Sequence, residues 1–305
     1  MEYIKPKDLC IIESENEFVL RRGFLHVNEL MIDKRGSSED FVKALHEFSQ
    51  DGKAEIIDED IDEDFLQLLH FGLIDIKSNK NIIVIAGNRT YEKVRECFSD
   101  NVKVINVNDI LTKEQRTLLN DEKSAVKLNQ VYSDVSPLLE VYDKIYYLDS
   151  FSEIKNLRAI NRLTGELDKE ITFGFYDYEN IYVTDVLHGT TGCFECLEKE
   201  IITKFENTMD YYEEQNDKFG GYEFGKAEIN ILTGLILKDI DNVVKYGSSS
   251  LMGHVLHFYL PNFEYSYNMN RRQVSCPCCA SINNTLFEEQ NVRAVNLLKR
   301  MTKND

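Results

Sequence analysis

The residues whose spacing most clearly indicates chemistry are cysteines. The stretches "GCFECLEKE" and "SCPCC" each hold a C-x-x-C pair, Cys193/Cys196 and Cys276/Cys279. Two such pairs can close a tetrahedral zinc site with bonds of about 2.3 Å, and a site with four protein ligands has no open position for catalysis. The spacing therefore predicts a structural zinc site. Cys278 precedes Cys279, and the sequence leaves open which of the two binds the metal.

Two other interpretations of the cysteine pairs stay open. A redox pair follows a strand, opens a helix and has one thiol of lowered pKa, but a second C-x-x-C has no role in such a site. The cysteines could also be buried thiols without a ligand. The histidines at 26, 188, 254 and 257 show no spacing typical of a Ser-His-Asp or Cys-His set, so we expect no catalytic residue.

Composition excludes several classes of partner. The chain has 305 residues, 43% of them apolar, which is enough for two domains. Its 53 acids against 35 bases give a net charge of −18, which repels phosphate backbones and anionic membranes. No stretch approaches the ~20 apolar residues that span a bilayer, and the first residues do not resemble a signal peptide. We expect a cytoplasmic protein without nucleic-acid or membrane partners, whose cysteines are thiols or metal thiolates.

A small domain over residues 1–78 is predicted from the first part of the chain. Residues 9–30 alternate short apolar runs with polar ones, which indicates two or three antiparallel strands. "SSEDFVKALHEFSQDG" and "DEDFLQLLHFGLIDI" then have capping residues and helical apolar spacing, and "LIDI" indicates a returning strand. Together with a short linking helix, these elements predict a winged helix-turn-helix. "DEDIDED" at the start of its last helix has the wrong sign for DNA.

The linker "KSNKN" separates this domain from a second one over residues 82–305. "NIIVIAG", "TYEKVRECF" and "VKVINV" are typical of a strand, a helix and a strand, and further strands and helices follow. The fold class we predict is α/β, with an N-terminal winged helix-turn-helix (α+β) followed by a Rossmann-like domain. The turn after the first strand reads "AGNRTYEK", with Gly87 in place of a glycine-rich phosphate loop, so we do not expect ATP use by this chain.

The order of these elements resembles the ubiquitin-activating and ThiF-like adenylating family over roughly residues 82–285. "YLDSFSEIKNLRAIN" is similar to its middle segment, with Asp149, Arg158 and Asn161 at matching places, and the four cysteines match its structural zinc ligands. The glycine-rich loop and the Arg and Lys that handle triphosphate are not found. A winged helix fused to such a degenerate domain is similar to the ocin-ThiF and McbB-like proteins of thiazole/oxazole peptide biosynthesis.

That resemblance implies a scaffold. Members of those families bind the leader of a ribosomal precursor peptide through a PqqD-like winged helix, the RiPP recognition element. They present the precursor to a YcaO protein, which uses ATP to form thiazoline and oxazoline rings in bacteriocins or thiopeptides, often beside a flavin-dependent dehydrogenase. The resemblance further implies a homodimer, for which the long helix near residues 226–245 offers apolar surface.

A leader-binding edge is part of the same expectation. An extended peptide can add as a strand to an exposed sheet edge, where backbone hydrogen bonds give affinity and side-chain pockets give selectivity. The residues expected to contact the leader are Leu25, His26, Val27, Asn28, Phe65, Leu68 and Leu69. Each of the apolar ones could instead belong to the core.

Two competing functions remain at this point. The chain could be an active adenylating enzyme that acts on a peptide or carrier C-terminus, with Asp149 near a metal-nucleotide complex. It could also be an acidic winged-helix regulator, which would bind DNA with a steep salt dependence. ATP–pyrophosphate exchange distinguishes the first from the scaffold, and the net charge argues against the second.

Overall fold

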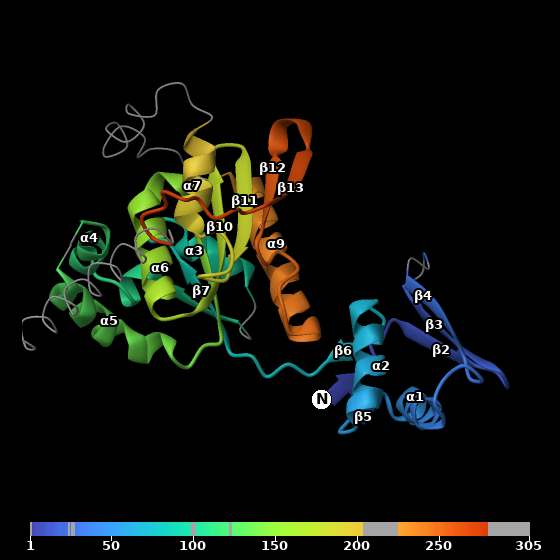
Figure 1. Cartoon of the computed structure of the whole chain (residues 1–305). Helices are drawn as coiled ribbons and strands as arrows, with labels where there is room; N and C mark the ends of the chain where they lie inside the picture. Colours follow the sequence, from blue (N-terminus) through green and yellow to red (C-terminus); the bar gives the residue numbers. More distant parts are fainter. Residues whose placement is uncertain are drawn as a thin grey trace, which may run out of the picture. The chain divides into compact units, whose positions relative to one another are not determined.

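The computed structural model describes residues 2–23, 25, 28–98, 102–121, 124–203 and 225–279 (Figure 1). They form two compact units: the chain up to Lys80 together with Asp239–Ser250, and the rest from Asn81 onward. The sequence gives no sign that Asp239–Ser250 would group with the first unit. Within the described residues, no helix combines the length and the apolar character that crossing a bilayer requires.

Two small antiparallel sheets, two helices and the segment Asp239–Ser250, which contains the end of helix α9 (Lys226–Tyr246), make up the first unit. One sheet is a meander in the order β2-β3-β4, and the other has the order β5-β1-β6. The strands are β1 (Glu2–Ile4), β2 (Leu9–Glu13), β3 (Glu17–Arg22), β4 (Asn28–Asp33), β5 (Lys53–Glu55) and β6 (Asp75–Ile76). The antiparallel strands expected over residues 9–30 are confirmed as the meander.

Both helices of the first unit begin at capping side chains. α1 (Glu39–Asp51) starts after Ser38, whose Oγ accepts a hydrogen bond from the Phe41 N–H at 3.2 Å. α2 (Glu59–His70) starts after Asp58, whose carboxylate accepts from first-turn amides. The acids of "DEDIDED" therefore stabilise the start of a helix, where the backbone N–H groups favour negative charge.

The connection between α1 and α2 differs from the sequence prediction. Where the winged-helix interpretation places a short linking helix, the structure has the strand β5, which pairs with β1. α1 ends at Gly52 with φ of 72°, and the Gly52 carbonyl accepts from the Lys5 N–H, so the chain turns directly onto β1. The linking helix is wrong, and the winged-helix assignment of this unit stays a prediction.

An aromatic cluster forms the core of the first unit. The ring of Phe65 in α2 lies 5.1 Å from Tyr3, 5.8 Å from Phe41 and 5.5 Å from Phe48, centroid to centroid. All four side chains are buried. Offset and edge-to-face aromatic pairs of this kind add about 0.5–1.5 kcal/mol each beyond the burial of their area.

A seven-stranded mixed sheet, in the order β13-β12-β11-β10-β9-β7-β8, organises the second unit. β8, β7, β9 and β10 run parallel, and β11, β12 and β13 extend the sheet antiparallel. The strands are β7 (Ile82–Ala86), β8 (Lys103–Asn106), β9 (Lys144–Ser150), β10 (Glu170–Asp177), β11 (Asn180–Val186), β12 (His254–Tyr259) and β13 (Glu264–Met269). The unit is thus an α/β unit, as predicted.

Helices cover both faces of this sheet (Figure 1). Phe173 and Phe175 of β10 pack against Phe194 of α7 on one face, while Gly174 between them leaves room for Leu232 and Ile236 of α9 on the other. The helices are α3 (Tyr91–Cys97), α4 (Lys113–Asp121), α5 (Ala125–Leu139), α6 (Ile154–Glu166), α7 (Phe194–Ile202) and α9 (Lys226–Tyr246).

Candidate functional site

The four predicted zinc ligands lie together. Sγ of Cys193 is 3.8 Å from Sγ of Cys196 and 3.5 Å from that of Cys276, and Sγ of Cys196 is 3.2 Å from that of Cys279. All four sulfurs lie within 4.8 Å of one another. A tetrahedral ion with bonds of about 2.3 Å needs sulfurs about 3.8 Å apart. The cluster can therefore hold one tetrahedral metal ion, and its all-sulfur ligands fit zinc.

Cys279, not Cys278, completes the cluster. Cys278 is the neighbouring thiol and does not belong to the group of four. A further contact suits a thiolate, because the backbone N–H of Gln273 donates to Sγ of Cys196 at 3.3 Å. The geometry therefore favours Cys279 over Cys278 as the second ligand that "CPCC" would contribute.

Gly192 allows the two cysteine segments to approach. Its N–H donates to the carbonyl of Asn270 at 3.0 Å. A Cβ at position 192 would lie 2.4 Å from Asn270 Oδ1 and 2.8 Å from the carbonyl oxygen of Arg271. A side chain there would therefore separate the segment that follows β13 from the start of α7, and with it the two halves of the cluster.

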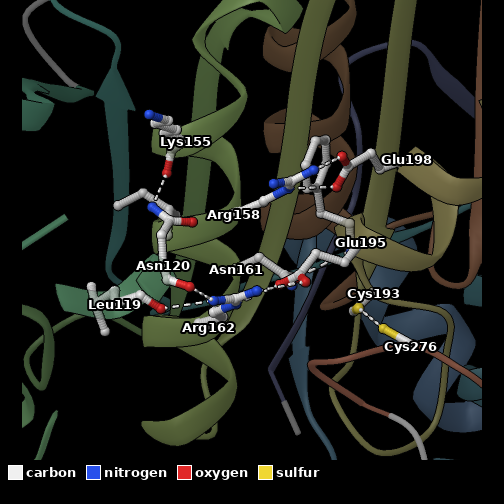
Figure 2. A network of polar contacts seen from close by, with 12 residues as sticks. Leu119, Asn120, Lys155, Arg158, Asn161, Arg162, Cys193, Glu195, Glu198 and Cys276 are labelled. Carbon is white, nitrogen blue, oxygen red and sulfur yellow. Dashed lines mark hydrogen bonds and ion pairs between the residues drawn. The ribbon is translucent and has the colours of Figure 1, made fainter. Parts of the chain in front are cut away.

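A set of ion pairs fixes α7, which carries the first cysteine pair, to α6 (Figure 2). Arg158 binds Glu198 through Nε at 2.9 Å and through Nη2. Arg162 binds Glu195 through Nε at 2.9 Å and Nη2 at 3.0 Å. Both glutamates are buried. We call these four residues the α6–α7 brace; breaking one such buried pair costs about 3–5 kcal/mol.

Asn161 joins the same brace. Its Oδ1 accepts from the Phe194 N–H at 3.1 Å, which caps the first turn of α7, and its Nδ2 donates to Glu195 at 3.3 Å. Arg158 and Asn161, which the family resemblance places in the middle segment of an adenylating domain, therefore make internal contacts. Arg162, Glu195 and Glu198 were not predicted from the sequence. Their spacing at i, i+4 and i, i+3 on two helices is the only signal that could have indicated them.

The turn after β7 is shaped by Asp149. A Cβ at Gly87 would lie 2.0 Å from Oδ1 of Asp149, so the glycine of "AGNRTYEK" makes room for this carboxyl group. Asp149 accepts hydrogen bonds from Tyr147 Oη at 2.6 Å, the Ser150 N–H at 2.8 Å and Asn156 Nδ2 at 3.2 Å. Burial nevertheless raises the pKa of Asp149 to about 7, because desolvation outweighs these bonds.

A cavity of about 370 Å³ opens where the parallel strands end. Its lining includes residues that follow β7, β8 and β9, and ligands of open α/β sheets bind at this carboxyl edge. Arg89, Lys113, Arg116 and Lys155 face Asp121 and Glu153 there, so cations outnumber acids. The Nη1 of Arg116 is buried and has no hydrogen-bond partner among the described residues. These cations were not found in the sequence, because they come from three separate segments.

The predicted leader-binding residues differ in their exposure to solvent, and two of them lie outside the described residues. Leu25 is 83% exposed, Asn28 begins β4, and His26 and Val27 lie outside the described residues. Phe65, Leu68 and Leu69 are buried in the core of the first unit. These three therefore belong to the core of the first unit. A leader contact at any of the seven residues stays a prediction.

The structure describes three of the four histidines for which we expect no catalytic role, and each of the three contacts a neighbouring side chain. Burial lowers the pKa of His188 to about 4, and its Nε2 lies 3.3 Å from Thr164 Oγ1. His254 stacks on Tyr267, and His257 stacks on Tyr182. His26 lies outside the described residues.

Comparisons of the sequence with protein-family models and with curated proteins give no match. The structure is similar to Escherichia coli MccB, with a TM-score of 0.48 and 15% identity over 92% of this chain and 97% of that one. It is also similar to the heterocyclase TruD, with a TM-score of 0.47 and 11% identity over 92% of this chain and 42% of TruD.

A further similar structure is a heterocyclase in complex with substrate and cofactor, with a TM-score of 0.49 and 12% identity over 92% of this chain and 39% of that one. This chain spans less than half the length of the two heterocyclases.

Proposed function

We propose that this chain is a non-catalytic scaffold that binds the leader of a ribosomal precursor peptide and delivers it to a YcaO cyclodehydratase, which forms thiazoline or oxazoline rings. One observation carries the proposal: among the described residues, β4 is the last strand of its sheet, and no described strand pairs with its outer edge. The partners would be the leader peptide, the YcaO protein, a flavin-dependent dehydrogenase and a second copy of this chain.

The contacts of the second unit support a structural role for it. Residues that an adenylating domain needs for chemistry are here tied to other side chains: Asp149 to Tyr147 and Asn156, and Arg158 to Glu198. We propose that Cys193, Cys196, Cys276 and Cys279 hold a structural zinc ion, because their four sulfurs would fill its coordination sphere. Ring formation would then take place on the partner chain.

A titration tests the leader-binding function. The leader half of a precursor peptide encoded beside this gene is labelled, and its fluorescence anisotropy is followed as the full-length chain is added. We expect a Kd of about micromolar or tighter, because backbone pairing and side-chain pockets act together.

Two variants locate that binding. Met31→Pro removes an N–H on the open edge of β4 and should weaken binding at least about tenfold, whereas Met31→Ala keeps the N–H and should retain most of it. Circular dichroism checks that both variants fold. A chain that binds no leader, or that binds it equally well with proline at position 31, contradicts the proposal.

The cavity at the carboxyl edge supports a second candidate, the adenylating enzyme. Four cations with one unpartnered buried guanidinium nitrogen fit a polyphosphate, and ATP carries one. ATP–pyrophosphate exchange in the presence of the full precursor peptide tests this function. Exchange that disappears in Arg116→Met but persists in Met31→Pro would favour the enzyme over the scaffold.

A further inference from the structure

Successive residues of β4 direct their backbone N–H and C=O groups alternately toward β3 and toward the open edge. The Lys34 N–H donates to the Asn16 carbonyl at 2.8 Å, which fixes the alternation of bonded pairs between β3 and β4. Leu30 and Ile32 therefore exchange backbone hydrogen bonds with β3. Glu29 and Met31 direct their N–H and C=O groups away from it, toward the open edge.

Side chains along this edge follow the same alternation. Glu29, Met31 and Asp33 lie on the outer face of the sheet, where Met31 is 60% exposed, and Leu30 and Ile32 lie on the inner face against the core. Residues directly opposite each other in an antiparallel pair share a face and contact each other. The edge therefore presents Glu29, Met31 and Asp33 on one face, where Glu29 is already ion-paired with Arg21 of β3 at 2.6 Å, and two apolar side chains on the other.

The first unit has a negative net charge. Residues 1–80 contain nineteen acidic and ten basic side chains, half of the net charge of the whole chain. This field attracts a cationic peptide and repels an acidic one. A second copy of the chain is disfavoured as the occupant, because it carries the same −18 charge and the same acids on β4.

We propose that the segment recognised at β4 is a cationic strand with a strict alternation. Two basic residues flank an apolar one at every second position, beside Glu29, Met31 and Asp33, and the two residues between them are apolar and pack beside Leu30 and Ile32. The identification of the bound segment as a leader peptide rests on the proposed function. Its positive charge and its alternation of basic and apolar residues rest on the contacts of β4.

Designed peptides test this chemistry on the full-length chain. The probe is fluorescein-labelled GGKILVKGG, whose lysines fall opposite Asp33 and Glu29 in an antiparallel register. One control, GGKKILVGG, has the same composition but cannot place both lysines on the outer face. The other, GGEILVEGG, reverses the charge. We expect the probe to bind at least about tenfold more tightly than either control, with a Kd that rises with salt.

Backbone methylation tests the pairing without altering the protein. N-methylation of the probe's leucine removes the N–H that would donate to Met31, so binding should fall by at least about tenfold. N-methylation of its valine alters an N–H directed away from β4 and should be tolerated. The double variant Glu29→Gln, Asp33→Asn should reduce the preference for lysine over glutamate to less than about threefold.

The outcomes separate the two proposals. Equal binding of the three peptides, or equal effects of the two methylations, overturns the cationic strand while tight binding of the natural leader keeps the scaffold function. A chain that binds neither the designed peptides nor the leader overturns both.

Discussion

The edge of β4 and the cavity at the carboxyl edge of the large sheet are the two candidate binding regions, and they differ in charge and in shape. The edge is an open strand flanked by acids, Glu29 and Asp33, whereas the cavity is a hollow that opens to solvent and is rich in cations such as Arg116 and Lys155. A ligand attracted by one is repelled by the other. This difference indicates that ligands of a single charge do not bind at both regions.

The two regions also differ in what holds them. The cavity belongs to a unit whose α6–α7 brace and cysteine cluster fix its helices, and the edge belongs to a unit held by an aromatic core. Changes in one unit should therefore leave the other region's binding intact. Five substitutions probe what holds each unit, in order of decreasing expected effect.

Removal of one of the four proposed zinc ligands should separate the regions most strongly. Cys196→Ser leaves three thiolates, so the chain should lose its metal and a large part of the about 10–16 kcal/mol that structural zinc provides in small zinc domains. Mass spectrometry of the metal and thermal unfolding measure both. Cys278→Ser is the control, and it should keep the metal. Loss of metal in that control would contradict the ligand assignment.

Asp149 should give the second unit a distinctive pH dependence. Its pKa rises from 3.8 to about 7 in the folded chain because it is buried. Between these values the folded state holds a proton that the unfolded state releases, so stability falls as pH rises, by up to about 1.4 kcal/mol per unit. Asp149→Asn should remove this slope in urea unfolding at pH 4–7.

Tyr147→Phe should extend the pH dependence that Asp149→Asn removes. The Tyr147 hydroxyl lowers the pKa of Asp149 by donating to its carboxylate. Without this hydroxyl, the pKa of Asp149 should rise further, so the free energy of unfolding should keep falling up to a higher pH. A slope that is the same in both variants and in the wild type would show that another group titrates.

The cavity should be more stable without its unpartnered cation. Arg116→Met replaces a buried nitrogen that lacks a hydrogen-bond partner among the described residues, so the free energy of unfolding should rise by about 1 kcal/mol. Lys113→Met, at an exposed position of the same helix, should change it by less than about 0.5 kcal/mol. Peptide binding at β4 should not change in either variant. A destabilised Arg116→Met would mean that Arg116 supports the fold.

The smallest effect is expected at the start of α1. Ser38→Ala removes the oxygen that accepts from the Phe41 N–H and should destabilise the first unit by about 1 kcal/mol. Ser38→Gly should cost only a few tenths of a kcal/mol, because glycine leaves the amide open to water. Denaturant unfolding measures both, and metal content should be unchanged. Equal costs for the two variants would argue against capping.

The sequence predicts the cysteine cluster well, because each C-x-x-C pair is local and two such pairs indicate one shared tetrahedral metal ion that brings them together. It also predicts the meander and the parallel strands, whose apolar patterns are local too. The brace and the cavity could not be predicted, since Arg162 and Glu195, or Arg89 and Arg116, meet only after distant segments pack. The linking helix was wrong because pairing with β1 overrides the helical continuation after Gly52.

The cysteine cluster also has a consequence during synthesis. Its two pairs lie 83 positions apart, with α9, β12 and β13 between them. At about 5–20 residues per second, about 4–17 s pass before the second pair follows the first out of the ribosome. Throughout that interval Cys193 and Cys196 are half a ligand set, open to oxidation or to capture by another thiol. Metal supply during that interval should therefore affect the yield of this protein.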